Sequence, residues 1–177
     1  MVNSPFQEMG PNMIEKIGII PAESKQNILN EVILNGDINN IRIKKTLAFF
    51  AENEKWSSLW NLANTLQREV SILFDNEENI WVDIGTRGEV RMSPPLGAKI
   101  PFKIWIHTHP YDAYWSMTDL DTLASFSSIM ESAMVLGHDH YKLTRKIKSD
   151  EQKSLGREGP LRLWTDEKIK KYNEEII

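Results

Sequence analysis

An amphipathic helix pattern that runs directly into two apolar strand patterns is the feature that most constrains this fold. The stretch KWSSLWNLANTLQREV, residues 55–70, repeats apolar residues at the i, i+3, i+4 and i+7 spacing of one helix face: Leu59, Leu62, Ala63 and Leu66. Ser57 is its candidate N-cap. The following stretch, EVSILFDNEENIWVDIG, has two short apolar runs around residues 75–79, which predicts a hairpin. We therefore expect the helix to pack its apolar face on a sheet.

The residues before this unit predict two further helices. The pattern AESKQNILNEVILNG, residues 22–36, is helical and ends on Gly36, a plausible C-terminal cap. A second helix is expected from about Asp37 through residue 55, although Ile41 and Ile43 fit a strand equally well. We expect residues 1–55 to form a small helical extension and residues 56–177 to form the main domain.

The rest of the chain alternates between strand and helix patterns. We expect a possible short strand over Glu89–Met92, a strand in FKIWIHTHP, residues 102–110, and a helix that begins at Thr118 with Asp121 as its acidic capping partner. Residues 132–148 predict a strand, a turn and a strand. Residues 160–177 predict a short strand and a terminal helix capped by Thr165. Helices on a mixed sheet indicate an α/β (α+β) fold.

Composition excludes several kinds of function. The chain of 177 residues has a net charge of −4, which gives no electrostatic reason to expect nucleic acid, and its basic clusters are interpreted as solvated faces. It has no cysteine, so a metal would be held by nitrogen and oxygen. The apolar runs are too short for a membrane span, and the first residues do not resemble a signal peptide. We expect a cytoplasmic protein with no membrane partner.

The stretch IHTHPYDAYWSMTDLD, residues 106–121, combines the side chains of a metal site. Alternate residues of a strand share a face, so His107 and His109 can reach one ion. Pro110 ends the strand, and a short loop returns Ser116 and Asp119 to the start of the next helix. Two imidazoles, a carboxylate and a water make a tetrahedral zinc site with an open position. The alternative is a polar strand end followed by a helix-start carboxylate.

The string HTHP followed by SMTD resembles the signature of the JAMM, or MPN-plus, metalloproteases. The resemblance extends from about Leu59 to the end of the chain, but its specific part is residues 107–119. It implies an MPN-like fold in which His107, His109 and Asp119 bind zinc and Ser116 stabilises the oxyanion. It also implies an upstream catalytic glutamate, and Glu69 occupies that position. The alternative for Glu69 is a surface carboxylate; Glu77, Glu78 and Glu89 fit the catalytic position less well.

One departure from the signature concerns the loop. The family places the aspartate eleven positions after the second histidine, whereas Asp119 lies ten positions after His109. Leu120 at the eleventh position cannot bind a metal, and Asp121 is the fallback ligand. Asp119 is preferred because it keeps the S-x-x-D spacing.

The resemblance implies a zinc-dependent metallopeptidase that cleaves a peptide or isopeptide bond at the C-terminal tail of a ubiquitin-like modifier, with Glu69 as general base and then acid. A non-catalytic MPN-type scaffold and a DNA-repair-associated JAMM relative are the alternatives. The absence of cysteine excludes a cytidine-deaminase-like site. A second histidine pair, His138 and His140, is interpreted as a solvated turn rather than a metal site.

Overall fold

The computed structural model describes residues 13–14, 23–86, 88, 92 and 94–172. In this part of the chain seven strands form one sheet in the order β1-β3-β2-β4-β5-β6-β7. Only β4 and β5 pair in parallel, and the other neighbours are antiparallel. The strands are β1 Met13–Ile14, β2 Val70–Phe74, β3 Ile80–Ile84, β4 Ile104–Thr108, β5 Ser132–Leu136, β6 His140–Arg145 and β7 Lys170–Lys171.

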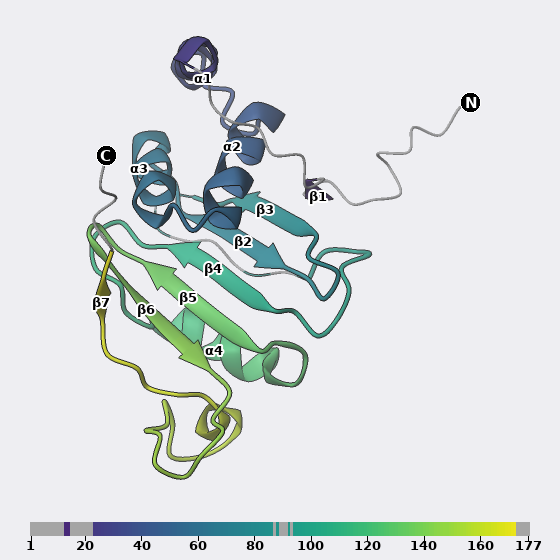
Figure 1. The fold of residues 1–177 in the computed structure, drawn as a ribbon, viewed down its shortest axis with the longest axis vertical. Helices are drawn as coiled ribbons and strands as arrows, with labels where there is room; N and C mark the ends of the chain where they lie inside the picture. Colours follow the sequence, from purple (N-terminus) through teal and green to yellow (C-terminus); the bar gives the residue numbers. More distant parts are fainter. Residues whose placement is uncertain (1–12, 15–22, 87, 89–91, 93, 173–177) are drawn as a thin grey trace.

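Helices cover both faces of this sheet (Figure 1). They are α1 Glu23–Leu34, α2 Ile41–Glu52, α3 Trp56–Leu66 and α4 Met117–Ser125. Ile72 and Ile106 point from the strands into a core with α2 and α3. Their strand neighbours Leu73 and Trp105 point to the opposite face, where they pack with Leu123 of α4. This alternation follows from the two-residue period of a strand, and it confirms the predicted α/β (α+β) layers.

The predicted hairpin and the first three helices are confirmed, with corrections at two helix starts: α2 begins at Ile41 rather than near Asp37, and α3 lacks its predicted cap. Ile41 and Ile43 lie in α2, because the Asn40 side chain accepts a hydrogen bond from the Arg42 amide and caps that helix. Ser57 is not an N-cap. Helix α3 begins at Trp56, so Ser57 is already inside it, and the preceding residue provides no side-chain cap.

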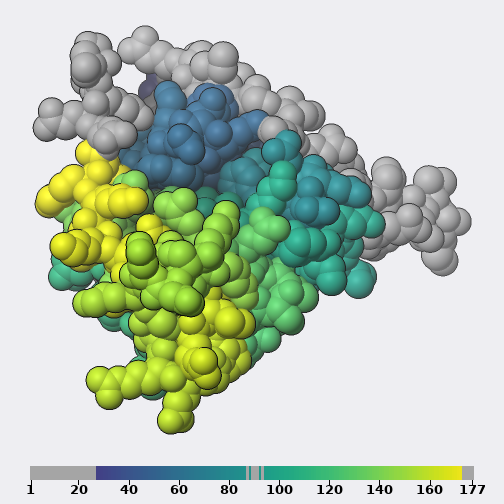
Figure 2. All heavy atoms as spheres, turned by 60° about the horizontal axis from the view of Figure 1, so that its bottom comes forward, coloured from purple at the N-terminus to yellow at the C-terminus, as the bar shows by residue number. Residues whose placement is uncertain are grey.

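The predicted terminal helix is wrong as far as residue 172, and residues 173–177 lie outside the described part of the chain. The predicted short strand is also wrong, because residues Pro160–Leu163 form a 3-10 turn, η2. Trp164 and Thr165 then make isolated bridges to Lys146 and Ser154 before β7 pairs with β6. The Thr165 hydroxyl accepts a hydrogen bond from the Arg145 amide at 3.0 Å, and its carbonyl accepts one from the Thr144 hydroxyl at 2.6 Å. These bonds hold Thr165 in an extended conformation, so it cannot cap a helix. Figure 2 shows this C-terminal part, light green to yellow, gathered on one side of the molecule.

The segment predicted as a helical extension contributes to the main core. Leu29 of α1 and Ile43 and Leu47 of α2 are buried in the same cluster as Leu59 of α3. The domain boundary between residues 55 and 56 stays a prediction. Most of the possible strand Glu89–Met92 lies outside the described residues, and Met92 itself is buried outside any strand. In the described ranges, every helix is too short or too polar to cross a bilayer.

Candidate metal centre

Strand β4 delivers two histidines to one point on the α4 face of the sheet. His107 lies within the strand, and His109 follows it, with its amide still bonded to the Leu136 carbonyl of β5 at 2.9 Å. The ring centroids of the two histidines are 5.1 Å apart. Trp105 stacks on the His107 ring, with a centroid distance of 4.3 Å and an interplanar angle of 13°. The prediction that both imidazoles share a face is confirmed.

The start of α4 brings Asp119 to the histidines. Ser116 is the N-cap: its hydroxyl accepts from the Asp119 amide at 3.2 Å, and the Asp119 carboxylate accepts from the Ser116 amide at 2.9 Å. This capping box orients the carboxylate, whose oxygens lie 3.0 Å from His107 Nε2 and 3.1 Å from His109 Nε2. The predicted cap pair Thr118 and Asp121 is therefore wrong by two residues, because Thr118 already lies inside α4.

The three side chains are buried and coupled electrostatically. Burial alone would raise the pKa of Asp119, but the contacts with His107 and His109 outweigh it and hold that pKa well below its ordinary range. Burial lowers the pKa of His107, and the nearby Asp119 offsets this only in part. The site thus favours an ionised carboxylate and a neutral imidazole, which are the protonation states that bind a metal.

The hydrogen bonding of His107 is incomplete among the described residues. Its Nε2 faces Asp119 without hydrogen-bond geometry, and its Nδ1 has no hydrogen-bond partner. Buried polar groups are nearly always satisfied, so an unsatisfied one calls for an explanation. A ligand atom from each of His107, His109 and Asp119 lies within 4.8 Å of the others. This group could hold a metal ion, and three protein ligands would leave a fourth position open.

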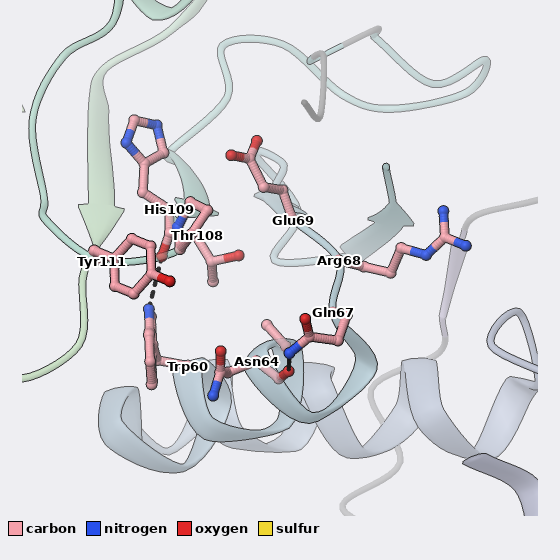
Figure 3. Close-up of a pocket in the computed structure, with 10 residues that line it drawn as sticks. Trp60, Asn64, Gln67, Arg68, Glu69, Thr108, His109 and Tyr111 are labelled. Atoms are coloured by element: carbon pink, nitrogen blue, oxygen red, sulfur yellow. Dashed lines mark hydrogen bonds between the residues drawn. The ribbon is translucent and has the colours of Figure 1, made fainter. Parts of the chain in front are cut away.

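Glu69 shares a pocket with one member of this group, His109. It immediately precedes β2, and it is tied to Thr86 by an amide-to-carbonyl bond of 2.8 Å. Its side chain is buried, which contradicts the alternative of a surface carboxylate. A pocket of about 310 Å³ is lined by both Glu69 and His109. In Figure 3 the Glu69 carboxylate and the His109 ring lie on the same side of that pocket, above Trp60 and Asn64 of α3.

The other acidic candidates do not join the site. Glu77 and Glu78 are exposed in the hairpin turn between β2 and β3, and Asp121 is exposed on α4. Glu89 lies outside the described residues. The structure thus brings together the predicted ligands and places Glu69 at the neighbouring pocket, while Ser116 acts as the cap of α4.

Sequence reasoning missed two side chains that support the site. The Trp60 indole donates to the His109 carbonyl at 2.8 Å, and no motif distinguishes this tryptophan from the other apolar residues of its helix. His140 is buried rather than solvated, and its Nε2 accepts from the Ala113 amide at 2.9 Å. The interpretation of the His138 and His140 pair as a solvated turn is therefore wrong for His140. For His140, its alternating position in a predicted strand was the one available sequence signal of burial.

Comparison with family models, curated proteins and solved structures finds no match to this chain.

Proposed function

We propose that this chain is a zinc-dependent metallopeptidase in which His107, His109 and Asp119 hold the ion. The observation that carries the proposal is a buried set of two imidazoles and one carboxylate. One of the imidazoles, His109, lines a pocket together with Glu69. Zinc accepts nitrogen and oxygen ligands in this number and keeps a position for water. The resemblance of residues 107–119 to the JAMM signature supports zinc over other metals and peptide hydrolysis over other reactions.

The proposed chemistry assigns one role to each remaining side chain. A bound zinc ion would supply a water with a pKa of about 7. Glu69 would accept a proton from a water whose oxygen adds to the scissile carbonyl carbon, and would return that proton to the leaving amine as the carbon–nitrogen bond breaks, with no covalent link to the protein. The Ser116 hydroxyl accepts a hydrogen bond from the Asp119 amide. Its own hydrogen is then available to donate a hydrogen bond to the oxygen of the scissile carbonyl.

The proposed substrate is the C-terminal tail of a ubiquitin-like modifier joined to an amine, as the resemblance implies. The pocket beside His109 supports a polypeptide ligand, because it combines aromatic Trp60 and Tyr111 with the amides of Asn64 and Gln67. The one-residue-shorter loop between His109 and Asp119 bears on substrate geometry more than on metal binding. The non-catalytic scaffold is the alternative that the experiments below distinguish.

Metal content is the first test. Protein purified without chelators should contain about one zinc per chain by elemental analysis, since the three ligands form one site. Protein stripped and reloaded should recover the same stoichiometry. Protein that contains no zinc and cannot be loaded, or that holds iron in its place, would exclude the proposed chemistry.

The second test separates catalysis from metal binding. Glu69→Gln keeps the shape of the side chain and removes the base, so hydrolysis of a modifier extended by a lysine-containing peptide should fall about a hundredfold or more. Zinc content should be unchanged. Glu77→Gln in the exposed turn is the matched control and should cleave like the parent. Equal activity of Glu69→Gln and the parent refutes the role of Glu69, and a zinc-loaded parent with no hydrolysis favours the scaffold.

A further inference from the structure

The loop that joins the two halves of the candidate metal centre rests on the turn between β5 and β6. This loop, residues 110–116, leads from His109 to the cap of α4. The His138 amide donates to the Tyr111 carbonyl at 2.7 Å. A Cβ atom on Gly137 would lie 2.7 Å from both the Tyr111 carbonyl oxygen and the Ala113 nitrogen. The contact is therefore a close backbone approach that only glycine permits.

His140, the first residue of β6, holds the middle of this loop. Its Nε2 accepts a hydrogen bond from the Ala113 amide at 2.9 Å. Its Nδ1 lies 2.6 Å from Asp139 Oδ1, and Asp139 Oδ2 lies 2.6 Å from the Lys171 ammonium. An imidazole nitrogen that accepts a bond carries no proton, so the ring proton of His140 must lie on Nδ1, facing Asp139. Asp139 thereby selects the tautomer that binds the loop.

These contacts also exclude a second metal site at the histidine pair. Both ring nitrogens of His140 already have partners. The His138 side chain is exposed, and its ring meets the Trp60 indole edge-on with a centroid distance of 5.0 Å. The two residues contact the loop instead, His138 through its backbone amide and His140 through its ring.

We infer that His140, with its tautomer set by Asp139, is a positioning residue that holds the 110–116 loop and thereby places Asp119 against His107 and His109. Ala113 is almost fully buried and lies three residues before Ser116, which orients the Asp119 carboxylate. The other end of the loop is held where the Trp60 indole bonds the His109 carbonyl. Anchors on both sides restrict the six residues between His109 and Ser116, and this restriction keeps the Asp119 carboxylate 3.0 and 3.1 Å from the two imidazoles. The catalytic consequence rests on the proposed function; the loop contact does not.

Two substitutions separate the two bonds of His140. In His140→Gln the side-chain oxygen reaches about as far as Nε2 and can accept from Ala113. In His140→Asn the shorter amide can keep the contact with Asp139 but cannot reach Ala113. We expect the zinc dissociation constant to rise about 10-fold to 100-fold in His140→Asn, the usual effect of losing support behind a metal ligand, and to stay near the parent value in His140→Gln. Equal weakening in both variants would overturn the inference.

Two measurements by NMR spectroscopy do not depend on metal or activity. The ring nitrogen shifts of His140 at neutral pH should show a proton on Nδ1 and none on Nε2. Hydrogen exchange of the Ala113 amide should be slow in the parent and in His140→Gln, and fast in His140→Asn, while urea unfolding reports whether each variant is folded. A proton on Nε2, or an Ala113 amide that exchanges equally in both variants, contradicts the inference. If the parent binds zinc but cleaves nothing, the proposed function fails while this test remains decisive.

Discussion

Asp119 has two structural duties, and replacing it tests both. Its carboxylate closes the capping box at Ser116 and contacts the rings of His107 and His109. With metal removed by a chelator, Asp119→Ala loses a capping interaction of about 1 kcal/mol. It also removes the partner of two buried imidazoles, at about 1 to 3 kcal/mol. We expect the free energy of unfolding to fall by about 2 to 4 kcal/mol in total.

Asp119→Asn separates the two duties. The asparagine oxygen can still accept from the Ser116 amide, so this variant should recover about 1 kcal/mol relative to Asp119→Ala. It removes the charge, however, and should bind zinc as poorly as Asp119→Ala. The parent should gain about 2.7 kcal/mol of stability when free zinc is a hundred times the dissociation constant. Both variants should gain almost nothing.

Urea unfolding with and without zinc measures these quantities. For a urea dependence of about 2 kcal/mol per molar, the metal-free Asp119→Ala midpoint should lie about 1 to 2 M below the parent midpoint. Asp121→Ala is the matched control, since Asp121 is exposed on the same helix and should cost only about 0.3 to 1 kcal/mol. If Asp119→Ala gains as much stability from zinc as the parent, or if Asp121→Ala alone loses that gain, our assignment of the third ligand is refuted.

Two further predictions concern the surroundings of the site. The contacts with His140 and Lys171 lower the pKa of Asp139 to about 2, below the value of about 3.9 in an unfolded chain. The stabilisation from the ionised form of Asp139 is therefore complete above about pH 4 and is lost as the pH falls toward 2. An NMR titration should give this low pKa in the parent and a higher one in Lys171→Met; an ordinary pKa in the parent would count against the contacts. Leu123→Ala, on the buried face of α4, should reduce the free energy of unfolding by about 2 to 5 kcal/mol, whereas Leu163→Ala at an exposed position should change it by less than about 0.5 kcal/mol. Equal urea midpoints for these two variants would contradict the core assignment.

The sequence alone determined the layers of the fold and the residue types of the site. Apolar residues repeat with the helix period in α3, and short apolar runs form β2 and β3. These patterns predicted a helix packed on a hairpin, because they are local properties of the chain. The alternation of side chains along a strand predicted that His107 and His109 share one face. The resemblance to the JAMM signature, with its S-x-x-D spacing, pointed to Ser116 and Asp119, and the structure brings that aspartate to both histidines.

The exact helix starts and the chain ends depended on contacts that no local pattern contains. Ser116 and Thr118 both have an aspartate three residues on, so the capping pattern alone could not choose between them as the N-cap of α4. In the folded chain α4 begins just after Ser116, which directs Asp119 to the buried imidazoles of β4 and leaves Asp121 exposed. Thr165 has the composition of a helix cap, but hydrogen bonds to residues 144 and 145 of β6 keep it extended.

Burial of polar groups was likewise a property of the tertiary structure. Glu69 and His140 appear in sequence as polar residues near turns, and both are buried in the folded chain. His140 meets an amide 27 positions away, and the Trp60 indole meets a carbonyl 49 positions away. Side-chain hydrogen bonds across such separations leave no periodic signal, since they depend on which strands and helices become neighbours. Sequence could therefore name the candidate metal ligands, and only the folded chain revealed what holds them in place.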